Sequence, residues 1–271
     1  EISSFLNSSK GITPPDGKII YAQKDIGTKT VKKASLLMLN HKVMEVFAAD
    51  AEAEKLYADS INRIAEAVTD EMNVYSMLVP TQLEFTEPMY RNIQSSQKKT
   101  IEDINKNLSE RIKTIDAYSA LESHSDEYIY FGTDHHWTML GAYYGYSAFM
   151  KAQGTAPVNR QSFKKNTISN FYGPLSTELD KADAEQLKPD TIEWWDTQEP
   201  NEITTHMFSY ADGEAKEYHA SPLLDETKKD YSVFLTADHP LAVIENDNLL
   251  NNKTLLIVKD SYANDFAPWL V

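Results

Sequence analysis

The sequence EYIYFGTDHHWT (residues 127–138), followed by MLGAYYGYSAFMK (139–151), changes from an extended to a helical pattern through one short polar turn. The aromatic run before Gly132 predicts an extended segment, and Thr138 is a natural N-cap for a helix over 139–151. In α/β proteins a turn of this kind lies at the carboxyl edge of the sheet, where ligand sites form. Because the turn carries two histidines and an aspartate, we expect a functional site there.

The chain before this turn alternates between helical and extended patterns. Apolar residues at helical spacing predict helices over 50–72, with Asp50 as N-cap, and over 97–111. A short apolar run predicts a buried strand over 74–79 that is parallel to its neighbours, and a second strand is predicted over 112–117. This alternation is typical of an α/β fold with a mainly parallel sheet.

The remaining segments differ in character. A turn at 13–17 precedes a short predicted strand at 17–21. Residues 155–250 are rich in Thr, Asn, Asp, Glu and Pro, which predicts hairpins and loops: a β-rich insertion or lid within one domain that spans residues 1–271. After it, TLLIV (254–258) predicts a buried strand, and a helix is expected to begin within 264–270.

The composition limits the classes of function. The chain has 271 residues, which is enough for one sizeable domain, and a formal net charge of −15. An acidic surface without a basic cluster makes nucleic acid an unsuitable partner. There is no cysteine, so disulfides and thiolate metal sites are excluded. No apolar run is long enough to cross a bilayer. The chain opens on Glu1, which is consistent with a removed leader, and nothing indicates an oligomeric state.

A second polar turn follows the predicted strand 254–258 and carries Ser261. A serine hydroxyl is a weak nucleophile that needs a base within hydrogen-bond reach and a third group that orients this base. Asp134 and His136 have a spacing that lets both side chains face one pocket. We therefore expect Ser261 as nucleophile, His136 as general base and Asp134 as its orienting partner. The backbone amide of Ser261 and the side-chain amide of Asn264 are candidates for the oxyanion hole.

Other interpretations of these residues stay open. A serine before a helix is often only an N-cap. Asp134, His135 and His136 are all metal-ligand types, but adjacent histidines on an extended chain point to opposite sides and rarely share one ion. The sequence therefore assigns no metal and no cofactor. Trp137 is expected to pack against the turn, and the Trp194-Trp195 pair is expected to pack on the core in preference to a glycan.

Several motifs resemble those of a known family. Thr133-Asp134-His135-His136-Trp137-Thr138, with Gly141-Ala142-Tyr143-Tyr144, resembles the signature of the bacterial DHHW protein family. The segment 259–270 (KDSYANDFAPWL) resembles its second signature, and 171–173 and 234–240 resemble weaker blocks, so that the resemblance covers residues 70–271. One departure is Lys259-Asp260 before the serine, where related acetyltransferases carry Gly-Thr.

The resemblance implies a fold and an activity. The family is similar to SGNH-like O-acetyltransferases that modify exopolysaccharides such as alginate. It implies an SGNH-hydrolase-like three-layer sandwich and a Ser-His-Asp triad made of Ser261, His136 and Asp134. His135 falls on the variable position of the motif and receives no role in the triad.

The leading hypothesis is a serine esterase or O-acyltransferase, acetyl being the expected group, that acts on an extracellular or cell-surface glycan. Its partners would be a glycan or acyl-ester substrate and a membrane-bound acyl donor. The first alternative is a non-catalytic glycan-binding or scaffold protein that keeps the fold. The second is a metal-binding protein that uses the Asp-His-His segment.

Overall fold

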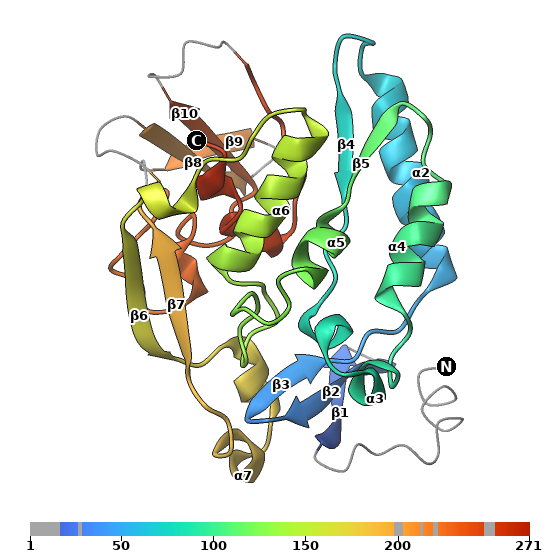
Figure 1. Ribbon diagram of the computed structural model, residues 1–271, viewed down its shortest axis with the longest axis vertical. Coiled ribbons are helices and arrows are strands. Elements are labelled where there is room, and N and C mark those ends of the chain that lie inside the picture. The colour runs from blue at the N-terminus through green and yellow to red at the C-terminus, as the bar shows by residue number, and fades with distance from the viewer. Residues whose placement is uncertain (1–16, 27–28, 198–202, 212–213, 219–221, 247–252) are drawn as a thin grey trace.

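The computed structural model describes residues 17–26, 29–197, 203–211, 214–218, 222–246 and 253–271. Figure 1 shows a mixed α/β protein built from helices and several small sheets. The strands within these residues form four small sheets, and one of these sheets is parallel. In the same part of the chain, no helix has both the length and the apolar character that a membrane span needs.

The parallel pair consists of β4 (Val74–Met77) and β5 (Ile112–Ile115), which lie next to each other in Figure 1. They follow the helices α2 (Ala51–Ala67) and α4 (Gln97–Lys106). The predicted order of helix, strand, helix and strand is therefore confirmed, with shorter bounds. Asp50 caps α2 as expected, because its side chain accepts hydrogen bonds from the first-turn amides.

Helices cover both faces of β4. On one face Tyr57 of α2 is hydrogen-bonded to Ser76 at 3.0 Å, and on the other Phe149 of α6 (Met139–Ala152) packs edge-on against Tyr75 at 5.4 Å between ring centroids. Consecutive strand residues point to opposite faces, so the two helices flank the strand. The paired strands described here do not extend this arrangement into a mainly parallel sheet, and the full three-layer sandwich stays a prediction.

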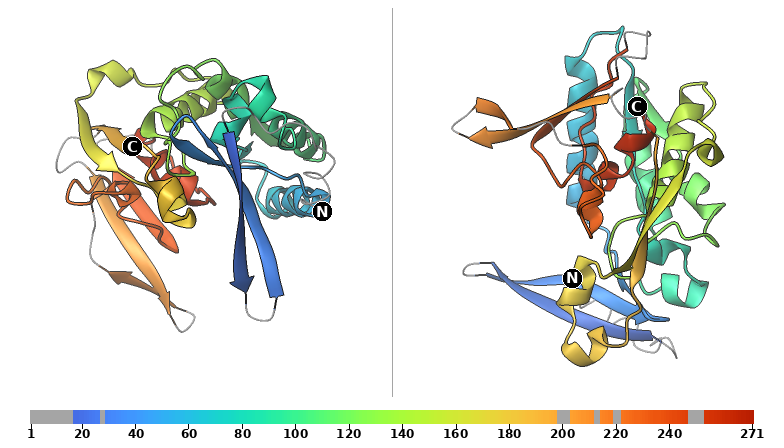
Figure 2. Two further views of the ribbon diagram at one scale, coloured as in Figure 1. Left: turned by 90° about the horizontal axis from the view of Figure 1, so that it is seen from below. Right: turned by 90° about the vertical axis from the view of Figure 1, so that its left-hand side faces the viewer.

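An antiparallel sheet precedes these elements. Its strands are β1 (Gly17–Ile26), β2 (Lys29–Leu39) and β3 (Lys42–Glu45), which project from one end of the molecule in Figure 2. The sequence predicted only the start of β1 at 17–21. The Val43 amide donates a hydrogen bond to the carbonyl of Gly132 at 2.7 Å, so this sheet supports the polar turn. The turn predicted at 13–17 lies outside the described residues except for Gly17.

The segment 155–250 contains antiparallel strands, as its composition predicts. β6 (Lys165–Phe171) pairs with β7 (Asp190–Trp195), and β8 (Ile203–Ala211) pairs with β9 (Glu214–Tyr218) and β10 (Leu241–Asn246). Trp194 and Trp195 are buried in the main core, which confirms that they pack inside the protein. The other α-helices of the described ranges are short: α3 (Pro88–Arg91), α5 (Ala117–Glu122) and α7 (Lys181–Ala184).

Two expectations for the last residues are wrong. Residues 254–258 form no strand: the segment 253–260 has no regular structure, and Leu256 and Val258 are 76% and 80% exposed. A strand needs a neighbouring strand for its backbone hydrogen bonds, and the apolar composition of a segment does not show whether such a neighbour exists. The helix expected within 264–270 is replaced by two 3₁₀ turns, Ser261–Asn264 and Ala267–Trp269, because Pro268 has no amide hydrogen to continue a helix.

Candidate active site

The polar turn is closed by a bridge between its two ends, and it is connected to α6 and to the segment that follows β4. Tyr130 and Trp137, at its two ends, form an antiparallel bridge. The hydroxyl of Tyr130 donates to the carbonyl of Pro80, just after β4. Thr138 caps α6 as predicted, because its hydroxyl accepts from the Gly141 amide at 3.3 Å. The loop therefore lies at the carboxyl edge of β4, as the sequence pattern suggests.

A buried carboxylate shapes the inside of this loop. Asp190, the first residue of β7, accepts hydrogen bonds from the Gly132 amide at 2.7 Å and the Tyr128 hydroxyl at 2.8 Å through Oδ1. Its Oδ2 accepts from the amide of Thr133 at 2.8 Å and from the hydroxyl of the same residue. These bonds fix the backbone immediately before Asp134.

Trp137 joins the loop to the segment that carries the serine. Its indole Nε1 donates to the carbonyl of Tyr262 at 2.8 Å and to Oδ1 of Asp265 at 2.7 Å. The ring is 1% exposed and packs so closely on α6 that a Cβ at Gly145 would lie 2.7 Å from it. Trp137 is thus a packing residue, as expected, and it also holds together two segments that are far apart in the sequence.

The three residues expected to form a triad lie in one hydrogen-bonded row. His136 Nδ1 is 2.7 Å from Asp134 Oδ1, and His136 Nε2 is 2.7 Å from Ser261 Oγ. The carboxylate accepts only, so Nδ1 carries the proton and Nε2 is free to accept the proton of the serine hydroxyl. His136 is 5% exposed and Asp134 is 3% exposed, which shields the row from water. This arrangement can deprotonate a serine as it attacks an electrophile.

The environment of Asp134 favours its charged form. Burial raises the pKa of this carboxyl, but hydrogen bonds from the side chain and the backbone amide of His136 outweigh burial and hold the pKa below its ordinary value. A Cβ on Gly173 would lie 2.4 Å from the Asp134 Cβ, so only glycine fits behind the carboxylate. Among the described residues Asp134 Oδ2 is buried and accepts no hydrogen bond.

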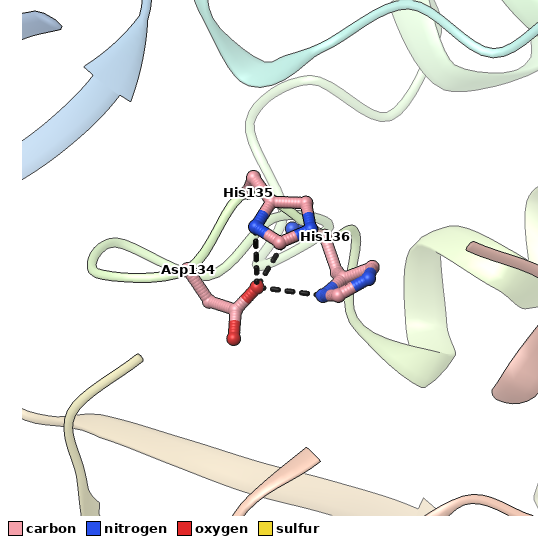
Figure 3. Close-up of side chains that lie close together, drawn as sticks. All are labelled: Asp134, His135 and His136. Carbon is pink, nitrogen blue, oxygen red and sulfur yellow. Dashed lines mark hydrogen bonds and ion pairs between the residues drawn. The ribbon is translucent and has the colours of Figure 1, made fainter. Parts of the chain in front are cut away.

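His135 does not point away from its neighbour, and that expectation is wrong. Its Nδ1 lies 3.6 Å from the same Asp134 oxygen that His136 contacts, and the two imidazole centroids are 3.9 Å apart (Figure 3). The loop is not extended at this point, so the alternation of side chains along a strand does not apply. Burial, together with the neighbouring His136, lowers the pKa of His135.

Tyr231 lies flat against the base. Its ring and that of His136 are 3.9 Å apart between centroids and 4° from parallel, and its hydroxyl donates to the Ser261 carbonyl at 3.0 Å. Burial raises the pKa of Tyr231 well above its ordinary value, so the phenol stays neutral. Tyr231 thus contacts both the histidine and the serine backbone.

The two oxyanion-hole candidates differ in their surroundings. The Ser261 amide donates no hydrogen bond to another described residue. The Asn264 side chain is 2% exposed, and its Nδ2 donates to Asp238 at 3.0 Å while its Oδ1 accepts from Lys259. Lys259 is also 3.5 Å from Asp238, so its charge is paired. One of the two amide hydrogens of Asn264 is thereby occupied.

Asp265 is a second buried carboxyl behind the row. It is 0% exposed, and burial raises its pKa well above the ordinary value despite the hydrogen bond from Trp137. Its Oδ2 is buried without a hydrogen-bond partner in the described protein. The two carboxyls of this region are therefore shifted in opposite directions: the pKa of Asp134 lies below its ordinary value and that of Asp265 lies well above it.

Sequence reasoning missed Asp190, Tyr231 and Asp265. Asp190 and Tyr231 belong to 155–250, where no motif distinguishes them from other polar and aromatic residues. Asp265 lies inside the second signature (259–270), so its position in that motif could have marked it as a candidate site residue. Its partner, Trp137, could only be found from the fold.

The fold and the site together define an α/β protein with serine, histidine and aspartate in one hydrogen-bonded row. A family model described as "DHHW protein" matches residues 17–271, and the chain belongs to this family. The resemblance of its two signatures to that family is thereby confirmed. No curated protein matches the chain.

Two solved structures share the fold, and a third was matched over part of the chain. A DHHW family protein from Eubacterium siraeum superposes with a TM-score of 0.77 at 26% identity, covering 94% of this chain and 82% of the other. PatB1 of Bacillus cereus, solved with a sulfonyl adduct, has a TM-score of 0.66 at 19% identity and coverage of 87% and 81%. The O-acetyltransferase domain of AlgJ from Pseudomonas putida gives a TM-score of 0.38 at 15% identity over 65% and 64% of the chains.

Proposed function

We propose that this DHHW protein is a serine-dependent esterase or O-acyltransferase that acts on an extracellular or cell-surface glycan, with acetyl as the group moved. The observation that carries the proposal is the row of hydrogen bonds from Asp134 through His136 to Ser261, with 2.7 Å at both steps. A base at this distance can take the proton of the hydroxyl without rearrangement. The expected SGNH-like sandwich belongs to the same proposal, with 155–250 as the insertion that supplies Asp190 and Tyr231.

The proposed reaction has two halves. Ser261 Oγ attacks the acyl carbonyl as His136 Nε2 takes its proton, and Asp134 stabilises the imidazolium that forms. The Ser261 amide and the remaining hydrogen of Asn264 stabilise the oxyanion. The donor's alcohol or thiol leaves with the proton from His136, and an acyl-serine remains. Water or a sugar hydroxyl then attacks the acyl-serine, His136 again moves the proton, and Ser261 is regenerated.

The competing hypothesis is a glycan-binding scaffold without catalytic activity. It predicts that the nucleophile and the base lie too far apart for a hydrogen bond. The geometry supports the enzyme instead. Lys259, which replaces a small residue of the related acetyltransferases, is drawn toward Asp238 and Asn264. Its charge is therefore balanced beside the serine.

The test is covalent labelling. An alkyl fluorophosphonate and a sulfonyl fluoride, the latter suggested by the sulfonyl adduct of PatB1, should each add one group to the wild type in intact-mass spectra. Ser261→Ala should remove the adduct, whereas Ser119→Ala, which alters an exposed serine of α5, should keep it. A folded wild type that stays unlabelled and hydrolyses no aryl acetate would overturn the proposal.

A second measurement separates hydrolysis from transfer. Aryl acetate turnover is followed with and without a defined oligosaccharide, and the sugar is analysed for added acetyl groups by mass spectrometry. Acetylated sugar formed by the wild type and not by Ser261→Ala identifies a transferase. Turnover that yields only acetate identifies an esterase.

A further inference from the structure

We propose that Asp134, His135 and His136 bind one transition-metal ion, for which zinc(II) is the best match, and that the bound ion takes His136 out of the triad. The inhibitory half of this proposal rests on the acyl chemistry proposed above. The binding half does not. The proposal also reverses the sequence argument that two adjacent histidines face apart.

The geometry brings three ligand atoms to one point. One oxygen or nitrogen from each side chain lies within 4.8 Å of the other two. The Asp134 Oδ1 atom is 3.6 Å from His135 Nδ1 and 2.7 Å from His136 Nδ1, and Figure 3 shows both rings turned toward this oxygen. Ligands around a tetrahedral zinc ion stand about 3.3 Å apart, given zinc–ligand bonds of about 2.0 Å. The three atoms, which lie within 4.8 Å of one another, reach this spacing by rotation of their side chains.

His135 is the residue whose orientation the triad does not explain. Its Nδ1 faces the buried carboxylate although His136 already satisfies that oxygen. Its side chain is 34% exposed, which gives an ion access from solvent. Its carbonyl accepts a hydrogen bond from the Tyr262 hydroxyl, which fixes its backbone. Two imidazoles and a carboxylate form a ligand set suited to zinc and similar ions.

The bound ion changes which nitrogen of His136 holds the proton. The ion occupies Nδ1, so the proton of this nitrogen moves through solvent to Nε2. A protonated Nε2 donates a hydrogen bond to Ser261 Oγ and no longer accepts its proton. Asp134 meanwhile coordinates the ion, and it no longer orients the base. The metal-bound protein therefore lacks a general base.

Binding is tested directly by titrating chelator-treated protein with zinc chloride in a calorimeter and with cobalt(II) by visible absorption. His135→Asn removes one ligand and leaves the Asp134–His136 hydrogen bond in place. Loss of a ligand should weaken zinc binding about ten-fold or more, since even outer contacts of metal sites cost that much. The matched control is His124→Asn, which alters a partly exposed histidine paired with Glu127 and should bind zinc like the wild type. Equal affinity of wild type and His135→Asn would overturn the site.

Inhibition is tested by the rate of fluorophosphonate labelling, with each variant compared with itself without zinc. Zinc should slow labelling of the wild type and of His124→Asn in proportion to occupancy, and should spare His135→Asn over the same concentrations. Zinc-saturated wild type that labels at full rate would overturn the inhibitory half. If zinc binding depends on His135 but the fluorophosphonate never labels the protein, the metal site is supported and the proposed function is rejected. Circular dichroism and thermal unfolding of each variant show that the fold is intact.

Discussion

The ring of Tyr231 lies parallel to the imidazole of His136, with 3.9 Å between the centroids and 4° between the planes. The contact joins residues that are far apart in the sequence, and it covers one face of the base. It restricts rotation of the imidazole, whose two nitrogens already contact Asp134 and Ser261. A base that is already held in its reactive orientation loses little conformational entropy when the reaction begins. We therefore infer that Tyr231 is a positioning residue.

Tyr231→Leu removes the flat surface and should lower kcat by about ten- to a hundred-fold, with little change in KM, because misplacement of a reacting group of about 1 Å can cost this much. Tyr231→Phe keeps the ring and loses the hydroxyl, with its hydrogen bond to the Ser261 carbonyl and its interaction with the Asp265 side chain, so it should retain most of the rate. Steady-state kinetics on an aryl acetate compare the two. Equal losses in both variants would mean that the hydroxyl, and not the stacked ring, matters.

The raised pKa of Asp265 predicts a pH dependence of stability. Burial raises its pKa, so the folded protein keeps the proton where the unfolded chain, with an ordinary pKa of 3.8, has lost it. The resulting stabilisation is complete below about pH 3.8 and is lost as the pH rises through the folded-state pKa. Asp265→Asn keeps an acceptor for Trp137 and cannot titrate. Relative to the wild type, its unfolding free energy should therefore increase as the pH rises from about 3.8 toward the folded-state pKa of Asp265, as measured in urea titrations. Parallel stability curves for the two proteins would show that Asp265 is already charged in the fold.

Asp190→Ala should destabilise the protein by about 3 kcal/mol or more, because it leaves buried backbone amides of Gly132 and Thr133 without an acceptor. Asp196→Ala, at the other end of β7, is the control: its carboxylate is partly exposed, and its loss should cost less than about 1 kcal/mol. Urea unfolding monitored by tryptophan fluorescence gives both values. A similar small cost at both sites would refute the anchoring role of Asp190.

Asn264→Ala separates an oxyanion donor from a structural amide. Loss of a donor that touches the oxyanion should lower kcat by about a hundred-fold or more with KM nearly unchanged. Asp238→Ala keeps the Asn264 amide but removes its acceptor, and with it the carboxylate that pairs with Lys259. If both variants lose the same small amount, Asn264 merely orders the loop. A much larger loss in Asn264→Ala assigns it to the oxyanion hole.

Local patterns predicted the helices α2, α4 and α6 from periodic apolar residues or from a cap such as Asp50 or Thr138. They predicted the strands β4 and β5 from short apolar runs. The same reasoning failed for 254–258, where an apolar run that looks like a strand is largely exposed. It also failed to find β2 and β3. Pairing between strands depends on a neighbour elsewhere in the chain, which local composition does not identify.

The sequence by itself determined the chemistry that this site can offer: an aspartate, a base and a serine in motifs of recognisable order. The tertiary structure decided which atoms meet. It brought Ser261 to His136, turned His135 toward the carboxylate that its neighbour uses, and supplied Asp190, Tyr231 and Asp265 as supports. The physical reason is that residue type fixes proton affinity and ligand preference locally, whereas contact, burial and the charge state of Asp265 arise only when distant segments pack together.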